Sequence, residues 1–397
     1  MSDEIFRKPF TQQEPLPEAA IARAVEVMRH GRLHRYNTLP GEHGEVADLE
    51  VEFADFTGAR FALAVASGGY ALACALRAIE LKHGEKVLTN AFTLAPVPGA
   101  IASVGGVPVL VEVTEDLVID LDDLEAKADQ ARVLMLSHMR GHICDMDRLM
   151  AIAGRHGLTV IEDCAHTMGA AWKGTPSGRH GLIGCYSTQT YKHMNSGEGG
   201  LIVSDDPMVM ARAILLSGSY MLYPRHRAAP ANGYFEHLKY DTPNVSGRMD
   251  NLRAAILRPQ LADLPAQIAR WNALYRRMEA GLADLERLQL VARPEAESFV
   301  GSSFQFRLPG FSAAMVVDFI TRCLARGVEL KWFGAREPMG FTSRHESWRY
   351  VPKADLPRAG AVLDTLVDMR LPLSFDPEDI SLISRIIRAE LLKTPVI

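Results

Sequence analysis

The amino-acid sequence predicts an α/β fold, in which a mainly parallel sheet of seven strands lies between helices and a smaller α+β domain follows. Short apolar runs rich in β-branched residues alternate with helix-like segments between about residues 60 and 215. From about residue 290, strand-like and helix-like segments are mixed instead. The 397 residues, 48% of them hydrophobic, are enough for one large core and a smaller one.

Seven short apolar runs are predicted to be the strands of the large sheet. They are residues 61–66, 86–89, 107–113, 132–138, 158–163, 183–189 and 200–204. Helices are predicted between and after them, at residues 70–81, 95–105, 120–128, 147–157 and 207–217. Strands that alternate with helices form parallel sheets with both faces covered, and ligands bind such sheets beyond the carboxyl ends of the strands.

The pattern changes in residues 219–244, which show little periodicity and many aromatic, proline and basic residues, so we predict a long loop. A helical pattern then resumes, with Pro259 and Pro265 as breaks or kinks. It connects to the second domain, where strands and helices mix. The predicted division is an N-terminal arm and large domain over residues 1–265, and a small C-terminal domain over residues 266–397.

Composition and charge argue against several classes of protein. The net charge is −5 and no dense Lys/Arg run occurs, so neither nucleic acid nor an anionic membrane is the expected partner. The polar N-terminus carries no secretory signal, and the most apolar stretch, residues 99–113, is too short to span a bilayer. Five scattered cysteines without a CxxC pair predict reduced thiols of a cytoplasmic protein. His30 and His34 are spaced as metal ligands can be, but no third ligand accompanies them, so no metal site is predicted.

Three short motifs follow predicted strands, and the first is Ser67-Gly68-Gly69. Glycines let the backbone approach a ligand, and the free N–H groups at the start of the following helix attract an anion. The motif fits a phosphate site to which Ser67 adds a hydroxyl. It equally fits a plain strand–helix turn in which Ser67 caps the helix.

The other two motifs place an acid and an amine at strand ends. Asp163 ends an apolar strand, three residues before His166, and fits either a partner for a protonated ring nitrogen or a cap for the next helix. Lys192 follows a strand that contains Ser187 and precedes a Gly-Glu-Gly-Gly turn. It fits either a buried, deprotonated amine that reacts with a carbonyl or a surface lysine beside a hairpin.

One ligand unites the three motifs. Pyridoxal 5'-phosphate carries a phosphate, a pyridine nitrogen and an aldehyde, so it needs an anion loop, an acid and a lysine. The order of anion loop, Asp163, Ser187 and Lys192 on a parallel α/β scaffold is more specific than any single motif. We therefore expect pyridoxal 5'-phosphate as the cofactor.

With these motifs, the chain resembles the DegT/DnrJ/StrS aminotransferases, pyridoxal-phosphate enzymes of fold type I that mostly aminate nucleotide-linked or free keto sugars. The resemblance covers nearly the whole chain. Its most specific blocks are residues 137–174, which contain EDCAH, and residues 186–200, which contain the lysine. Residues 49–69, 119–126 and 247–261 also match. The resemblance implies the fold type I architecture.

The resemblance also implies catalytic roles for Lys192, Asp163 and His166. Lys192 would form a Schiff base with the cofactor and then move protons between cofactor and substrate carbons. Asp163 would pair with the pyridinium nitrogen, and His166 would lie near the ring and its 3-hydroxyl. The other implied cofactor-binding residues are Ala165 on the ring face, Ser67, Gly68, Gly69 and Ser187 at the phosphate, and Asn244 and Ser246, through which the partner subunit of a homodimer completes the site.

The sequence departs from the family pattern at three positions. The phosphate loop reads SGG where the family usually has SGT, so a hydroxyl is missing at Gly69. Leu94 replaces an aromatic residue that often stacks on the cofactor ring, so Leu94 or Phe92 would pack there. Ser246 replaces an asparagine, with Asn244 two residues earlier, and either could reach the partner's phosphate.

Four residues are candidates for substrate contact. Residues 33–41 resemble a subgroup that acts on keto-sugar acids or other non-nucleotide sugars. Arg35, Tyr36 and Asn37 within them fit a substrate entrance, and they equally fit a loop packed against a dimer interface. Trp332, at the end of a predicted strand, is the fourth candidate.

These observations predict a cytoplasmic homodimeric aminotransferase with shared active sites. It would move an amino group from glutamate or glutamine to the ketone or aldehyde of a sugar-like acceptor. The alternatives are a natural-product tailoring enzyme similar to AHBA synthase, which acts on a non-sugar ketone, and a family member that binds the cofactor without turnover. Nucleotide sugar, free keto-sugar acid and cyclitol remain open as acceptors, as do dimer and tetramer.

Overall fold

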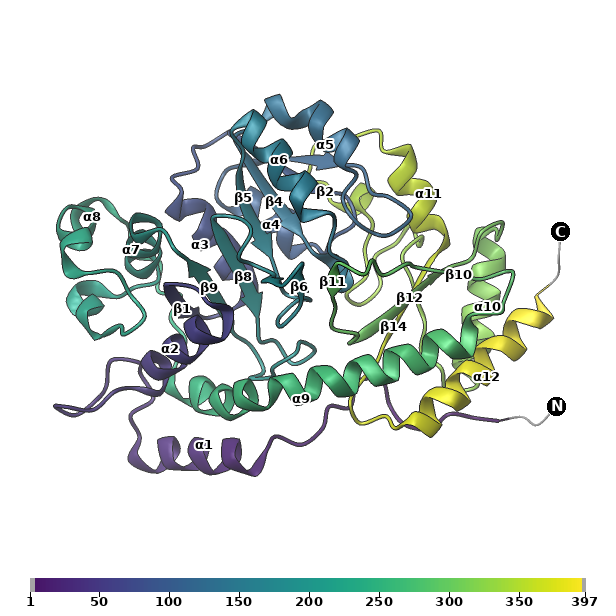
Figure 1. Ribbon diagram of the computed structural model, residues 1–397, viewed down its shortest axis with the longest axis horizontal. Coiled ribbons are helices and arrows are strands. Elements are labelled where there is room, and N and C mark those ends of the chain that lie inside the picture. The colour runs from purple at the N-terminus through teal and green to yellow at the C-terminus, as the bar shows by residue number, and fades with distance from the viewer. Residues whose placement is uncertain (1–3, 395–397) are drawn as a thin grey trace.

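A seven-stranded sheet forms the centre of the larger part of the chain in the computed structural model, which describes residues 4–394 (Figure 1). The strands lie in the order β1-β9-β8-β5-β4-β2-β3. Neighbours pair in parallel except at β9, which is antiparallel to both β1 and β8. The bounds are β1 (Phe61–Val65), β2 (Lys86–Asn90), β3 (Val107–Val111), β4 (Val133–Ser137), β5 (Thr159–Asp163), β8 (Ile183–Ser187) and β9 (Gly200–Ser204). The prediction of a mainly parallel seven-stranded sheet is confirmed.

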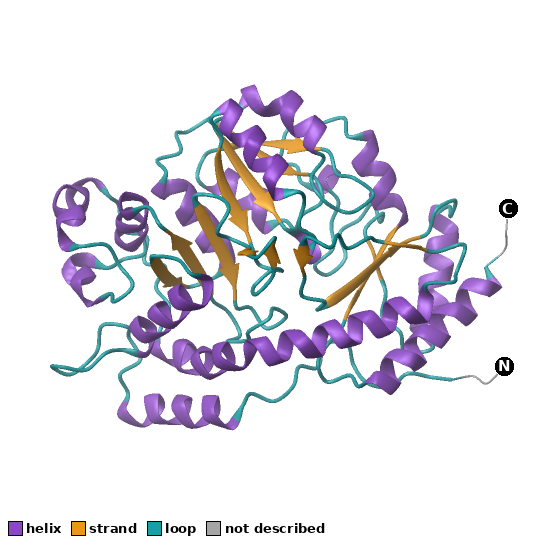
Figure 2. Ribbon diagram, viewed as in Figure 1, coloured by secondary structure: helices purple, strands orange, loops and turns teal. Residues whose placement is uncertain are grey.

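Helices cover both faces of this sheet, as Figure 2 shows. Alternate residues of β1 enter two separate apolar cores, with Ala62 and Ala64 in one and Leu63 and Val65 in the other. The helices are α2 (Glu45–Thr57), α3 (Gly68–Ala78), α4 (Pro96–Ser103), α5 (Leu121–Lys127), α6 (Met146–His156) and α7 (Pro207–Leu216), with the 3-10 turns η1 (Ala128–Gln130) and η2 (Met139–Gly141). The strands and helices predicted for this region agree with these bounds to within three residues.

The region predicted as one long loop contains short helices. They are η3 (Tyr220–Arg225), η4 (Asn232–Tyr234) and α8 (Phe235–Asp241). The buried Phe235 ring stacks on Tyr223 with ring centroids 4.2 Å apart. Both rings belong to the apolar core that contains much of α7, and this packing, which local periodicity does not reveal, holds the segment in place.

Helix α9 (Asn251–Leu282) connects the two parts of the chain and continues through Pro259 and Pro265. The prediction of a break at these prolines is therefore wrong. Figure 1 shows α9 running beside α1 (Glu18–His30), α2 and α12 (Pro377–Lys393). Packing along much of its length explains why two missing N–H donors do not end the helix.

The C-terminal part is a smaller α+β unit, as predicted. Its antiparallel sheet has the order β10-β12-β14-β13, and a second small sheet, β11-β6-β7, joins segments from both parts of the chain. The strands are β6 (Ala171–Trp172), β7 (Thr175–Pro176), β10 (Gln289–Leu290), β11 (Glu297–Ser298), β12 (Ser303–Arg307), β13 (Lys331–Trp332) and β14 (Leu366–Arg370). The remaining helices are α10 (Ala313–Ala325), η5 (His345–Ser347) and α11 (Pro357–Thr365).

The division of the chain at residue 265 stays a prediction. That position lies inside α9, and the N-terminal arm packs on the C-terminal unit, where Phe6 and Phe10 meet Phe375 edge to face. Among residues 4–394, no helix is both long and apolar enough to cross a membrane.

Candidate active site

A cavity of about 380 Å³ lies where several strands of the large sheet end, and the C-terminal sheet forms part of its wall. Its size is in the range of small-molecule sites. The cavity brings together nine residues that the sequence placed in a cofactor site. They are Ser67, Gly68, Gly69, Leu94, Asp163, Ala165, His166, Ser187 and Lys192.

Lys192 faces this cavity and not the outer surface. Its Nζ lies 2.9 Å from His166 Nε2. Burial lowers the pKa of Lys192 to about 7, and Asp163 opposes that shift by favouring the charged form. Burial, followed by the Lys192 charge, also lowers the pKa of His166 well below its usual value. Near neutral pH the site therefore holds a neutral imidazole beside an amine that readily gives up its proton.

Asp163, the last residue of β5, is held in a fixed orientation. Its Oδ2 accepts a hydrogen bond from Ser137 Oγ at 2.9 Å, and its Oδ1 accepts one from the backbone N–H of Ala165 at 3.1 Å. Ser137 Oγ in turn accepts from Thr93 Oγ1 at 2.8 Å. No helix begins after β5, where the next element is β6, so Asp163 is not a helix cap. The carboxylate is instead directed into the cavity wall.

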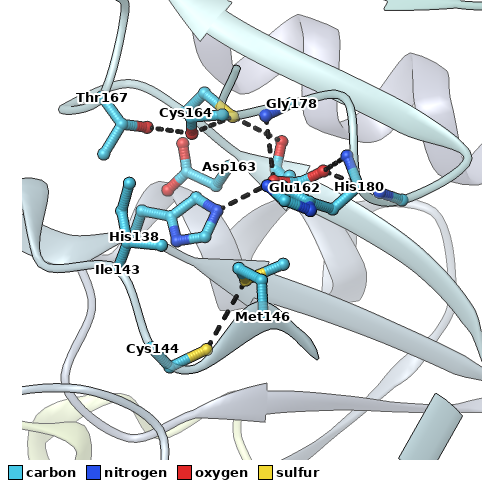
Figure 3. Close-up of polar contacts among 12 residues, drawn as sticks. His138, Ile143, Cys144, Met146, Glu162, Asp163, Cys164, Thr167, Gly178 and His180 are labelled. Carbon is cyan, nitrogen blue, oxygen red and sulfur yellow. Dashed lines mark hydrogen bonds and ion pairs between the residues drawn. The ribbon is translucent and has the colours of Figure 1, made fainter. Parts of the chain in front are cut away.

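The preceding residue, Glu162, anchors the same strand end from the opposite side (Figure 3). Its Oε2 lies 3.0 Å from His138 Nε2 and accepts the backbone N–H of Gly178 at 2.9 Å. Its Oε1 accepts two more backbone N–H groups, from residues 180 and 181. The backbone N–H of His138 donates to the carbonyl of Asp163 at 3.1 Å. This buried network stabilises the backbone that carries Asp163.

His138, Glu162 and Cys164 also place three possible metal ligands within 4.8 Å of one another. Glu162 already accepts several hydrogen bonds, and Cys164 Sγ accepts one from Ser177 Oγ at 3.2 Å. Because these donor atoms are engaged by the protein, the cluster has a structural role.

The start of α3 lies at the cavity wall. Ser67 caps the helix, because its Oγ accepts the backbone N–H of Tyr70 at 3.1 Å. Gly68 packs so closely on the end of β8 that a Cβ atom would lie 2.8 Å from Ser187 Cβ. A Cβ atom on Gly69 would meet nothing nearer than Pro96 at 3.9 Å. Ser67 thus caps the helix and also lines the cavity, so a helix cap and a phosphate site are compatible interpretations of this motif.

Several predicted cofactor residues lie outside the cavity of the single chain. Phe92 is buried and packs edge to face on Phe333, with centroids 5.1 Å apart, whereas Leu94 lines the cavity. Asn244 and Ser246 are exposed, and the Asn244 Oδ1 accepts the backbone N–H of Ser246 at 2.9 Å. Their role toward a partner subunit stays a prediction.

The four substrate candidates do not line the cavity either. Arg35 is buried in a two-pronged ion pair with Glu50, in which both N–O distances are 2.9 Å. The buried Tyr36 hydroxyl lies 2.7 Å from His226 Nε2, and Asn37 is exposed. Trp332 lines a separate groove, where its Nε1 donates to the carbonyl of residue 364. Within one chain, Arg35 and Tyr36 therefore form buried contacts of the fold, and a place for the four residues at a substrate entrance stays a prediction.

The cavity-wall residues that the sequence reasoning missed include two arginines and several apolar or aromatic residues. Among them are Arg140, Arg370, Met139, Tyr191 and Phe341. Arg140 follows the predicted strand 132–138, so its place at a strand end was a usable signal. Arg370 ends β14, which no local pattern had indicated.

A family model described as the DegT/DnrJ/EryC1/StrS aminotransferase family matches residues 17–388. The chain is 30% identical over 295 residues to a putative L-glutamine:3-amino-2,3-dideoxy-scyllo-inosose aminotransferase of Streptomyces kanamyceticus, covering 73% of this chain and 68% of that protein. It is 31% identical over 285 residues to dTDP-3-amino-3,4,6-trideoxy-alpha-D-glucose transaminase of Streptomyces venezuelae, covering 70% and 69%. Other relatives are matched over only about half of their length.

Among solved structures, S. venezuelae DesV in complex with a ketimine intermediate superposes with a TM-score of 0.78 at 26% identity and covers 93% of both chains. AHBA synthase superposes with a TM-score of 0.82 at 24% identity over 98% of this chain and 99% of that one, which shows a shared fold. These matches confirm the predictions of the family, the fold and the aminotransferase class. The chain belongs to the DegT/DnrJ/EryC1/StrS aminotransferase family.

Proposed function

We propose that this chain is a pyridoxal-phosphate-dependent aminotransferase that moves an amino group from glutamine or glutamate to the ketone or aldehyde of a sugar-like acceptor. One observation carries the proposal. A lysine whose pKa is lowered to about 7 lies in a small-molecule cavity together with a fixed carboxylate and an anion cradle.

The residues fit this cofactor by their chemistry and placement. The N-terminus of α3, with Ser67 and Gly68 against Ser187, would hold the phosphate, because a helix start offers free N–H groups to an anion. Asp163 would hold the ring nitrogen, and Lys192 would hold the aldehyde carbon. When bound, the cofactor supplies a carbonyl for the amine and a ring that withdraws electrons from the reacting carbon.

The chain's own side chains then manage protons. A group with a pKa near the working pH both takes and returns a proton efficiently, and Lys192 meets this condition. His166, held neutral, orients the lysine amine through the 2.9 Å contact. The Ser137 and Ala165 hydrogen bonds hold the Asp163 carboxyl group in one orientation, in which it would meet the ring nitrogen.

The similarity to an L-glutamine:amino-dideoxy-scyllo-inosose aminotransferase and to a dTDP-amino-sugar transaminase supports glutamine as the donor and an inosose ketone or a nucleotide-linked keto sugar as the acceptor. The fold shared with AHBA synthase keeps the tailoring alternative, amination of a non-sugar ketone, as the second candidate. We also propose a homodimer in which Asn244 or Ser246 reaches the partner's phosphate, because both are exposed and outside their own cavity. A cytoplasmic location is proposed because all five cysteines are free and buried.

The test is an absorption spectrum of the cofactor-loaded protein before and after addition of L-glutamine, and separately of L-glutamate. Lys192→Ala is the variant, and Lys353→Ala, at an exposed position, is the matched control. We expect a visible band that bleaches on addition of a donor in the natural protein and the control only. A protein that takes up no pyridoxal phosphate would contradict the proposal, and a bound cofactor that neither donor alters would favour binding without turnover.

A further inference from the structure

We propose that Arg140 and Arg370 form a subsite for a carboxylate group of the substrate, at the side of the cavity that faces the C-terminal sheet. This inference rests on the proposed function, since it names a chemical feature of the molecules that exchange the amino group. Its residues differ from those at the start of α3, which would hold the cofactor phosphate.

Arg140 is a buried cation with hydrogen-bonding capacity to spare. It lies in η2 with a left-handed φ of 56°, and its side chain is 7% exposed and lines the cavity. Its Nη2 lies 2.8 Å from Asp368 Oδ2, but the geometry is not that of a hydrogen bond, and Nε and Nη2 both lack a hydrogen-bond acceptor. A buried guanidinium left in this state is costly unless an acceptor reaches it.

Arg370 enters the same cavity from β14. Its guanidinium stacks on the Tyr191 ring at 3.7 Å from the centroid and lies 5.8 Å from the centroid of Phe341. Within residues 4–394, no carboxylate forms an ion pair with it. Stacking holds the plane of the guanidinium and leaves its N–H edge available for a planar, two-oxygen ligand.

The charges around the two arginines do not balance. Arg140, Arg370 and Lys331 share one buried carboxylate, Asp368, whose Oδ1 already accepts Gln305 Nε2 at 2.8 Å. Glu329 adds only a smaller effect, on Lys331. Lys331 Nζ is buried without a hydrogen-bond partner, and burial lowers its pKa to about 8. Burial, followed by the Arg140 charge, lowers the pKa of Arg370. These are the signs of a pocket that lacks a negative charge.

The position of the pair indicates where the carboxylate sits on the substrate. Both arginines line the same cavity as Lys192 and His166, and their charges help to lower the pKa of each of these groups. The other carboxylates of the cavity wall, Asp163 and Glu198, form no ion pair with either arginine in the described part of the chain. A carboxylate next to the carbon that carries the amine or ketone would satisfy both guanidinium groups. An amino acid donor and a keto acid acceptor share this chemistry.

The first test measures binding of glutarate, an unreactive dicarboxylate, to the cofactor-loaded protein by titration calorimetry. We expect Arg370→Met and Arg140→Met to weaken glutarate binding by roughly tenfold to a hundredfold, the range for a lost hydrogen bond to a charged group. Arg336→Met, in an exposed arginine outside the cavity, is the matched control and should bind normally. The neutral diamide of glutarate should bind weakly to every form.

Equal binding of glutarate and its diamide, or glutarate binding that the two cavity variants leave unchanged, would overturn the subsite. Arg370→Lys keeps the charge without the planar fork and should recover part of the affinity. Thermal unfolding of each variant identifies any that fails to fold. Arg370 is only half-buried, so Arg370→Met carries the test if Arg140→Met unfolds.

Single-turnover absorption then separates the two sources of the carboxylate. If it belongs to the donor, Arg370→Met slows reaction with L-glutamine but not with 4-aminobutanamide, which lacks the α-carboxylate. If it belongs to the acceptor, the variant slows the return reaction with pyruvate and spares the donor step. Glutarate binding that depends on Arg370 in a natural protein that transfers no amine would refute the proposed function and leave the subsite intact.

Discussion

Two adjacent glycines are expected to respond oppositely to the same methyl group. In Gly68→Ala, the added Cβ would lie 2.8 Å from Ser187 Cβ and 3.1 Å from its Oγ, so the start of α3 and the end of β8 must separate. In Gly69→Ala, the nearest atom is Pro96 Cβ at 3.9 Å, an ordinary contact. Overpacking of this kind costs about 1–3 kcal/mol. If the same free energy is lost from phosphate binding at the start of α3, pyridoxal phosphate binds roughly 5- to 150-fold more weakly.

The assay is equilibrium dialysis of pyridoxal phosphate against the natural protein and both variants, with urea unfolding of the cofactor-free forms. Gly68→Ala should lose affinity, whereas Gly69→Ala should keep it and unfold at no lower urea concentration, because alanine favours helices over glycine. Equal affinity in all three proteins would refute the assignment of Gly68 and Ser187 to a phosphate cradle. An equal loss in both variants would refute the reasoning from close contact.

Four further outcomes are expected. Uptake of pyridoxal phosphate should accelerate as the pH rises through about 7, because burial lowers the pKa of Lys192 from 10.5 and only the neutral amine attacks the aldehyde. A stopped-flow pH profile with its midpoint near the usual pKa of lysine would contradict this. Asp163→Asn should lower kcat/KM roughly a thousandfold in steady-state assays, since a charge pair at ~4 Å is worth about 4 kcal/mol at an effective dielectric near 20. An effect of only about tenfold would be too small for a carboxylate paired with the ring nitrogen. Arg35→Met should lower the free energy of unfolding by about 3–5 kcal/mol, because Glu50 is left buried without its counter-charge, and KM should stay unchanged. A raised KM without a loss of stability would instead indicate a substrate role for Arg35. Gly69→Thr should tighten cofactor binding, measured by dialysis, by roughly two- to tenfold, which is the value of one added hydrogen bond. Weaker binding would show that the loop has no room for the threonine side chain.

The predicted cofactor residues that the structure gathers in one cavity are mainly those at strand ends. Ser67, Asp163, Ser187 and Lys192 each follow or end a short apolar run, and all four line one cavity. Local rules suffice here, because parallel strands bring their carboxyl ends to one edge of the sheet. Once the strands are recognised, the proximity of these residues follows without knowledge of any side-chain contact.

The same reasoning gives no firm answer where long-range packing decides the outcome. Arg35 carries a charge in a loop-like segment, yet it is buried because Glu50, in α2, meets it. Pro259 and Pro265 remain inside α9 because neighbouring helices pack along it. Arg370 belongs to a strand, β14, in which apolar and polar residues do not alternate clearly. The Arg370 side chain stacks on Tyr191, which lies far away in the sequence.

The sequence by itself determined the α/β class, the family and the set of groups at the strand ends, because strand length, helix period and glycine turns are local properties of the chain. Only the tertiary structure decided the pKa of Lys192, the burial of Arg35 against Glu50 and the excess of positive charge around Arg140 and Arg370. Burial and charge balance depend on which distant residues surround a group, and no spacing along the chain specifies those neighbours.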